Sequence, residues 1–83
     1  MVGQPNYERL PEHMRGGMRR YLEDKIEPGH FLMAVLENNL KEAVGHADEI
    51  NRDRLPDYVM FLYNEVSSAA WGSPEKVEAY LNG

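Results

Sequence analysis

Histidines and acidic side chains are the residues in this chain that could bind a metal ion or transfer a proton. The 83 residues include three histidines, His13, His30 and His46, and fourteen acidic residues. No two histidines are three or four positions apart, which is the spacing that puts two ligands on one helix face. His46 lies close to Asp48 and Glu49, but a histidine also suits a solvated helix C-terminus because of the helix dipole. We therefore expect no metal site.

The nucleophiles and cofactor motifs of common enzymes are missing from the sequence. There is no cysteine, which excludes disulfides, thiolate metal sites and a thiol nucleophile. Ser67, Ser68 and Ser73 lack the setting of a nucleophile elbow, and no phosphate-binding or dinucleotide-binding glycine pattern occurs. Most carboxylates fall on expected solvent faces, whereas catalytic carboxylates need a cleft that perturbs them. We expect a protein that is not an enzyme and uses no cofactor.

Arginines near the N-terminus form a candidate site for nucleic acid. Arg15 and Arg19 are four positions apart on one expected helix face, with Arg20 beside them, and such a row could contact phosphates. The alternative is that these arginines pair with acidic neighbours on a solvated face, namely Glu12, Glu23 and Asp24. The net charge of −5 argues mildly against general nucleic-acid binding.

The segments that carry these residues are predicted to be short helices. Residues 1–9 are polar, with a glycine and a proline, and are expected to be a flexible N-terminal tail before a helical domain of residues 10–83. The first helix is expected from Leu10 or Pro11 to about Lys25, since proline suits a helix start. Its Gly16-Gly17 pair either weakens the helix or allows another backbone to approach closely.

The middle of the chain holds three further helix signals. A turn at Pro28-Gly29 precedes a strongly apolar helix from His30, with an expected buried stripe of Phe31, Leu32, Val35, Leu36 and Leu40. Asn39 can cap a new helix from Leu40 to His46, which Gly45 would end. Asp48 can cap a helix through Val66, whose expected buried face is Leu55, Tyr58, Val59, Leu62 and Val66. Pro56 lies inside that stretch, so the helix either kinks there or begins again.

The stretch from Trp71 to Val77 marks the start of the last helix. Ser73 can cap it, Pro74 suits its first position, and Glu75 interacts favourably with its dipole. Trp71 is either a clamp that holds this helix against the rest of the protein or an exposed anchor for a binding partner. The stretch of residues 67–70 is expected to be a loop.

Together these signals predict an all-α fold, a single compact domain of four to five short helices. No strand-like alternation of useful length occurs. No apolar run reaches the roughly 18 to 20 residues that span a bilayer, so no membrane partner is expected. The chain start lacks the features of a signal peptide, and an intracellular protein is expected. The glycine pair could also allow close helix contact in a homodimer, which makes an oligomeric structural protein a further alternative.

From Leu10 onward the chain resembles a family of short proteins encoded in bacteriophage and prophage genomes. The resemblance rests on four segments, in this order: LPEHMRGGMRRYLE, PGHFLMAVLENNLKEAVGHADEINR, FLYNE and WGSPEKVEAYL. It covers nearly the whole chain apart from the first nine residues. No settled activity is known for the family, so the resemblance implies no catalytic or binding residue. It implies a phage accessory protein that acts in the bacterial cytoplasm.

Within that context, the leading hypothesis is a non-enzymatic protein that binds and modulates or inhibits a host protein, such as a CRISPR effector of a defence system. An acidic surface can block a nucleic-acid groove by matching its positive potential. The candidate contacts are the carboxylates of residues 37–57, with Glu42, Glu49 and Asp53 as the main ones, and Trp71. The alternative is a nucleic-acid-binding regulator that uses Arg15, Arg19 and Arg20.

Overall fold

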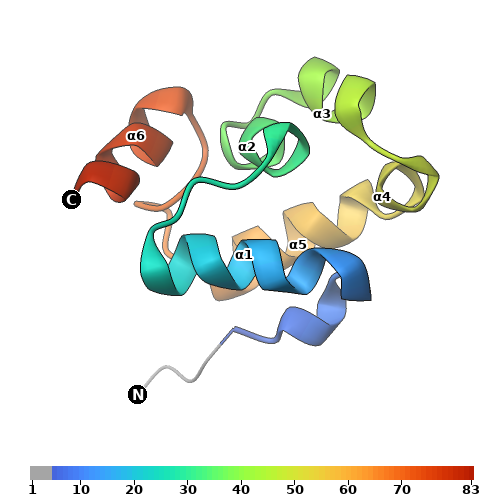
Figure 1. Ribbon diagram of the computed structural model, residues 1–83, viewed down its shortest axis with the longest axis horizontal. Helices are drawn as coiled ribbons and strands as arrows, with labels where there is room; N and C mark the ends of the chain where they lie inside the picture. Colours follow the sequence, from blue (N-terminus) through green and yellow to red (C-terminus); the bar gives the residue numbers. More distant parts are fainter. Residues whose placement is uncertain (1–4) are drawn as a thin grey trace.

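The computed structural model describes residues 5–83, and in this part of the chain it contains helices and no strand. A short 3-10 helix, η1 (Tyr7–Arg9), comes first. Six α-helices follow: α1 (Glu12–Asp24), α2 (His30–Leu36), α3 (Leu40–His46), α4 (Glu49–Asp53), α5 (Leu55–Glu65) and α6 (Pro74–Asn82). Figure 1 shows α1 running across the middle of the molecule, with α2 and α3 on one side and η1 on the other. The prediction of an all-α fold is confirmed.

Helix α1 runs unbroken through its glycine pair. Pro11 precedes the helix as its N-terminal cap residue, and Lys25 ends it in the left-handed conformation, with φ of 55°. A Cβ atom at residue 17 would lie only 3.1 Å from Leu32 Cδ1 of α2. Gly17 therefore leaves room for the Leu32 side chain of α2. The glycine pair was expected either to weaken the helix or to admit another backbone, and at Gly17 the neighbour is a side chain.

Helices α2 and α3 follow the predicted boundaries. The Asn39 side chain accepts a hydrogen bond from the Glu42 backbone N–H at 3.3 Å, so Asn39 caps α3 as expected. Gly45 does not end α3, because the helix continues through His46. The prediction that Leu40 belongs to the buried stripe of the preceding helix is wrong. Leu40 starts the next helix, and its side chain is 70% exposed.

Pro56 divides the stretch from Asp48 to Val66 into two helices. Asp48 caps α4 as predicted, by accepting a hydrogen bond from the Asn51 backbone N–H at 2.7 Å. Helix α5 then begins at Leu55 and carries Pro56 in its first turn. Backbone N–H groups in a first turn have no partner within the helix, so the missing N–H of Pro56 removes no helical hydrogen bond. The chain therefore begins a new helix at Leu55 and does not continue as one helix with a kink at Pro56.

Helix α5 buries a different set of side chains from the one that its apolar spacing predicted. Tyr58 and Leu62 are fully buried as expected, and Phe61 is buried between them. Val59 was expected on this face but is 52% exposed. The face defined by Tyr58, Phe61 and Leu62 keeps the spacing of three and four residues, and Val59 lies outside it.

The N-terminal segment packs onto the helices, which corrects the prediction of a flexible tail for residues 7–9. The Tyr7 ring is buried, with its centroid 5.7 Å from that of Phe61 in α5. Its hydroxyl donates a hydrogen bond to Glu23 in α1 at 3.2 Å. The Asn6 backbone N–H donates to the Glu65 carboxylate. A buried aromatic ring fixes this segment in place, while residues 1–4 lie outside the described part.

Hydrogen bonds before the start and near the end of the C-terminal helix attach it to the rest of the protein. The Ser73 hydroxyl accepts from the Lys76 backbone N–H at 3.1 Å, which confirms it as the cap of α6. Just before the helix, the Gly72 backbone N–H donates to the Leu36 carbonyl at 2.7 Å. Near the end of the helix, the Tyr80 hydroxyl donates to the Leu22 carbonyl. Residues 67–70 form the expected loop without helix. No helix of residues 5–83 is long and apolar enough to cross a membrane.

Candidate protein-binding surface

Arg15 is bound to the backbone of its own chain. Its Nε donates a hydrogen bond to the Leu10 carbonyl at 3.0 Å, and a second guanidinium nitrogen donates to the Glu8 carbonyl at 3.2 Å. These two bonds hold the turn between η1 and α1. A guanidinium occupied in this way has fewer donors left for a phosphate.

Arg19 and Arg20 do not extend Arg15 into one basic row. The Arg19 guanidinium lies 4.9 Å from the centre of the Tyr7 ring, and its Nε is 3.9 Å from the Glu23 carboxylate. Arg20 is exposed and its guanidinium lies over Gly16. Arg20 lines an open cleft between α1 and α2 rather than the side occupied by Tyr7. The three arginines of the candidate nucleic-acid site therefore do not lie together. Arg15 and Arg19 contact groups of their own chain, and Arg20 lies at the cleft between α1 and α2.

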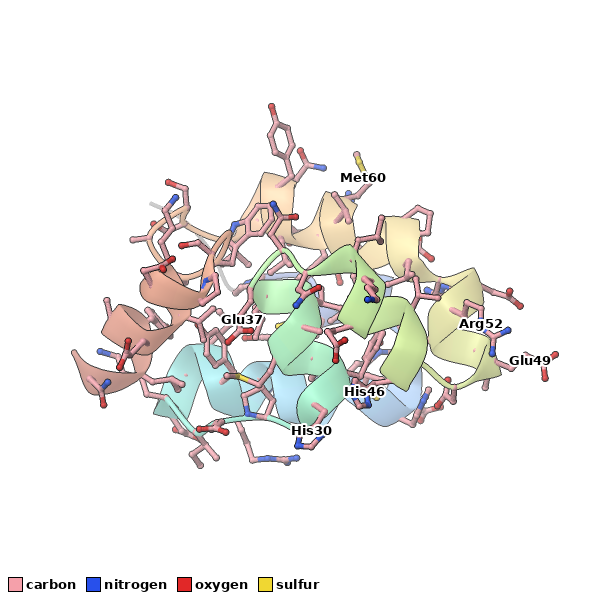
Figure 2. The ribbon with its side chains drawn as sticks, turned by 90° about the horizontal axis from the view of Figure 1, so that it is seen from above. His30, Glu37, His46, Glu49, Arg52 and Met60 are labelled. Atoms are coloured by element: carbon pink, nitrogen blue, oxygen red, sulfur yellow. The ribbon has the colours of Figure 1, made fainter. Side chains whose placement is uncertain are left out.

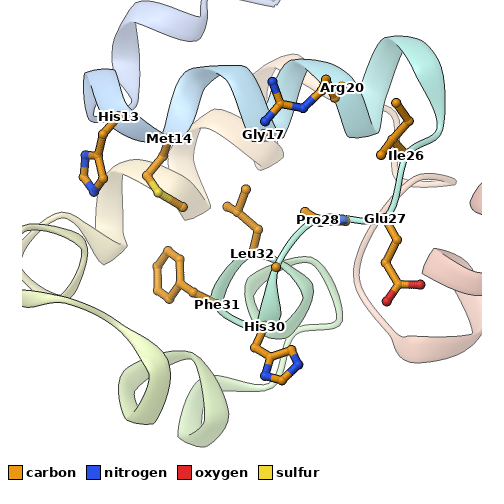
Figure 3. A pocket seen from close by; sticks show the side chains of 11 residues that line it. His13, Met14, Gly17, Arg20, Ile26, Glu27, Pro28, His30, Phe31 and Leu32 are labelled. Carbon is orange, nitrogen blue, oxygen red and sulfur yellow. The ribbon is translucent and has the colours of Figure 1, made fainter.

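The open cleft beside Arg20 has a volume of about 430 Å³. Figure 3 shows His13 and Met14 at one end of the cleft, Ile26 at the other end, and Phe31 and Leu32 below. His13 Nε2 lies 3.0 Å from the Asp48 carboxylate. Within residues 5–83, no group of three or more histidine or acidic side chains could hold a metal ion.

Asp48 joins α1 to α4 and serves two partners at once. The backbone N–H of Asn51 is the main cause that lowers the pKa of the Asp48 carboxyl, and the hydrogen bond with His13 adds to it. Its negative charge is therefore used within the fold, at the start of α4.

The other predicted acidic contacts are exposed but spread out. Glu42 Oε1 lies 3.3 Å from Nε2 of His46 in the same helix, α3. Glu49 and Asp53 belong to α4. Figure 2 shows Glu49 at the far end of α4, well away from Glu37. Glu49 and Asp53 are therefore neighbours on one short helix, whereas Glu42 belongs to another helix.

Trp71 packs against the hydrophobic core and is partly buried. Its indole Nε1 is inaccessible and has no hydrogen-bond partner within the described residues. The neighbouring bond from Gly72 to Leu36 holds the same segment against α2. This placement favours the clamp over the exposed anchor among the two alternatives for Trp71.

Large apolar side chains are exposed on the side formed by α3 and α5, and sequence reasoning missed this feature. We call the area around Leu40 and Val59, which border one hollow, the α3–α5 surface. Val44, Met60 and Tyr63 are further exposed apolar side chains of the same two helices. Figure 2 shows Met60 directed outward from α5, on the side away from α3. The spacing of Val59, Met60 and Tyr63 could have indicated a second apolar face of α5, next to the face that enters the core.

A hollow lies within this surface, between three helices. Its volume is about 50 Å³, and it is lined by Ala34, Val35, Asn38, Asn39, Leu40, Ala43, Leu55 and Val59. Ala34 and Ala43 are buried and small, so α2 and α3 leave space where larger side chains would fill it. Leu40 and Val59 stand at its edge on α3 and α5, and both are more than half exposed.

Tyrosines support the core beneath these surfaces. The Tyr21 hydroxyl donates to the Ala70 carbonyl at 2.6 Å, and the Tyr58 hydroxyl donates to the Asn51 side-chain oxygen at 2.7 Å. Burial is the main cause that raises the pKa of Tyr7 and of Tyr21 to about 12. Burial also raises the pKa of Tyr58 well above its usual range.

Comparison with known proteins gives no family or relative from which a function could be transferred. No protein-family model matches the chain, and no curated protein or solved structure matches it. The candidate function therefore depends on the geometry and chemistry of the described residues.

Proposed function

We propose that the protein acts by binding another protein directly through the α3–α5 surface, without an enzymatic step. The observation that carries the proposal is the exposure of Leu40 and Val59 around an apolar hollow. Single exposed apolar residues are ordinary, but Leu40 and Val59 border the same hollow, and adjoining exposed apolar side chains are more typical of a binding site. Burial of each such side chain by a partner contributes about 1.5 to 3 kcal/mol when burial is complete.

The net negative charge of residues 37–63 supports a partner with basic groups. Residues 37–63 contain six acidic and three basic residues, for a net charge of −3. Arg54 pairs with Asp57 and also bonds to the Arg9 carbonyl, so this ion pair uses one positive and one negative charge and leaves the net charge of −3 unchanged. A negative surface potential speeds encounter with a positively charged partner, and salt screens this effect.

The resemblance to short phage and prophage proteins supports a partner in the bacterial cytoplasm. In this version of the proposal the partner is a host protein, such as a component of a defence system, whose action is modulated or inhibited by contact. Proteins of that kind that act on nucleic acid carry basic grooves, which match the negative charge of residues 37–63.

Affinity capture from bacterial lysate, with and without nuclease, tests the proposal. We expect a specific protein to be retained after nuclease treatment and to be identified by mass spectrometry. Loss of every partner on nuclease treatment would contradict the proposal and favour nucleic-acid binding through Arg15, Arg19 and Arg20.

Charge reversal tests the electrostatic part of the proposal. We expect Glu42→Lys, Glu49→Lys and Asp53→Lys each to slow association, and we expect the effect to shrink as salt increases. Glu78→Lys is the matched control, because it makes the same charge change on α6. An equal effect of the control, or binding independent of salt, would reject a contribution of the acidic residues.

A further inference from the structure

We infer that the cleft between α1 and α2 binds a small organic carboxylate, whose apolar body fills the cleft and whose charge pairs with Arg20. This inference goes beyond the proposed function, because the cleft shares no lining residue with the hollow between α2, α3 and α5. Three features carry it: the size and lining of the cleft, the guanidinium on its wall, and the glycine pair beneath that guanidinium.

The cleft has the size and the lining of a small-molecule site. Its volume of about 430 Å³ lies within the range of roughly 300 to 1,000 Å³ that such sites occupy. Phe31 and Leu32 are buried side chains that close its base, whereas Ile26 at one end is 49% exposed (Figure 3). An apolar body in the cleft would remove the Ile26 side chain from water, which favours binding.

The charge on the wall of the cleft comes from Arg20. Figure 3 shows its guanidinium directed along α1 toward Gly17. The Glu27 carboxylate and the His30 ring point away from α1 in the same view. In the part of the chain that the structure describes, no ion pair involves Arg20. A guanidinium presents a planar fork of donors that matches a carboxylate, so this wall favours an anion of that shape.

A second carboxylate near the cleft is already engaged within the fold. His13 lines the end of the cleft opposite Ile26, and its Nε2 lies 3.0 Å from the Asp48 carboxylate. Asp48 also accepts a hydrogen bond from the Asn51 backbone N–H at 2.7 Å. The negative charge of Asp48 is therefore bound at this end, and Arg20 remains the charged group available to a ligand.

The glycine pair of α1 makes room for the wall and the base of the cleft. A Cβ atom at residue 16 would lie 3.1 Å from a guanidinium nitrogen of Arg20, and one at residue 17 would lie 3.1 Å from Leu32 Cδ1. Glycine inside a helix is less stable than alanine. The positions of Arg20 and Leu32 give both glycines a role in the cleft that offsets this cost.

Titration with three small molecules tests the inference on the full chain. The probe is naphthalene-2-carboxylate, which joins an apolar body to a carboxylate. Naphthalene-2-methanol keeps the body without the charge, and acetate keeps the charge without the body. Binding is followed by the backbone amide signals of the isotope-labelled protein in NMR spectra, which report both affinity and position.

We expect naphthalene-2-carboxylate to shift signals from residues 13–20 and 26–32, and each counterpart to bind at least about tenfold more weakly. Arg20→Gln should weaken binding of the carboxylate by about tenfold and leave binding of the methanol unchanged. Arg52→Gln is the matched control, because it makes the same charge change at an exposed position of α4. This variant should bind as the original protein does.

Gly16→Ala tests the position of the guanidinium. Alanine stabilises a helix relative to glycine, so the urea midpoint should rise, while the displaced guanidinium should lower the affinity for the carboxylate by about threefold or more. Gly45→Ala is the matched control, because a Cβ atom at residue 45 would meet no other atom within 4 Å. It should raise the midpoint and leave the affinity unchanged.

Five results would each overturn the inference: no shifts in residues 13–20 and 26–32, equal binding of the methanol, equal binding of acetate, unchanged binding by Arg20→Gln, or unchanged binding by Gly16→Ala. Binding of acetate as tight as that of the probe would mean that Arg20 attracts any anion and that the cleft adds nothing. Capture of a protein partner from lysate does not depend on these results, so failure here would leave the proposed function in place.

Discussion

The arginine side of α1 and the α3–α5 surface differ in whether their side chains are bound within the fold or exposed to solvent. Arg15 holds two carbonyl oxygens of the preceding turn, and Arg19 lies over the Tyr7 ring. Leu40 and Val59, in contrast, border a hollow and have large exposed fractions. These two arginines, which suggested a site from the sequence, thus contribute to the fold, whereas Leu40 and Val59 remain exposed.

The difference arises from what covers each helix. The segment with Tyr7 folds back over α1 and α5, and its backbone and ring meet the arginines. Within residues 5–83, no comparable segment covers the outward side of α3 and α5. The comparison therefore predicts large stability losses from changes near Tyr7 and small ones from changes on the α3–α5 surface.

The largest loss is expected from high pH. The pKa of Tyr7 and of Tyr21 rises from 10.0 to about 12 in the folded protein, so folding disfavours the ionised forms. Their contribution to stability is complete below pH 10 and declines as the pH increases from 10 to 12. Denaturant unfolding measured across this range should show a steadily lower midpoint, accompanied by tyrosinate absorbance. A midpoint that stays constant to pH 12 would show that these hydroxyl groups are not buried.

Removal of the Tyr7 ring should have the next largest effect. Tyr7→Ala deletes a buried aromatic ring against Phe61 and should lower the free energy of unfolding by about 3 kcal/mol. Tyr63→Ala is the matched control, because Tyr63 is 76% exposed, and it should change stability by less than about 0.5 kcal/mol. Urea unfolding of both variants measures the difference. Equal effects would mean that the N-terminal segment is not part of the folded unit.

Loss of the Arg15 guanidinium should have an intermediate effect. Arg15→Ala removes two hydrogen bonds to backbone carbonyls and should cost about 1 to 2 kcal/mol of stability. Arg20→Ala removes an exposed arginine of the same helix and should cost less than about 0.5 kcal/mol. If Arg15→Ala left stability unchanged but weakened binding to short DNA at low salt, Arg15 would serve nucleic-acid binding and not the fold.

Local signals in the sequence predicted much of this fold. Asn39, Asp48 and Ser73 each cap the helix expected of them, because a cap depends on backbone N–H groups only two or three residues away. Pro56 likewise restarts a helix for a local reason. The all-α class follows from such signals and from the apolar spacing.

Features that depend on distant parts of the chain were not predictable in the same way. Tyr7 appeared to belong to a polar tail because Phe61, its packing partner, is far away in the sequence. The backbone oxygens that bind Arg15 became visible only with the turn that presents them. The exposure of Val59 depended on which of two apolar faces of α5 enters the core. The candidate site was therefore predicted less well than the helices.

The most direct test joins binding and stability in one double variant, Leu40→Ser with Val59→Ser. Both side chains are already largely exposed, so the free energy of unfolding should change by less than about 0.5 kcal/mol per site. Retention of the protein partner in nuclease-treated lysate, measured beside urea unfolding of the same sample, should be lost although the fold remains. Full retention of the partner by the folded double variant would contradict the central claim that the α3–α5 surface is the binding site.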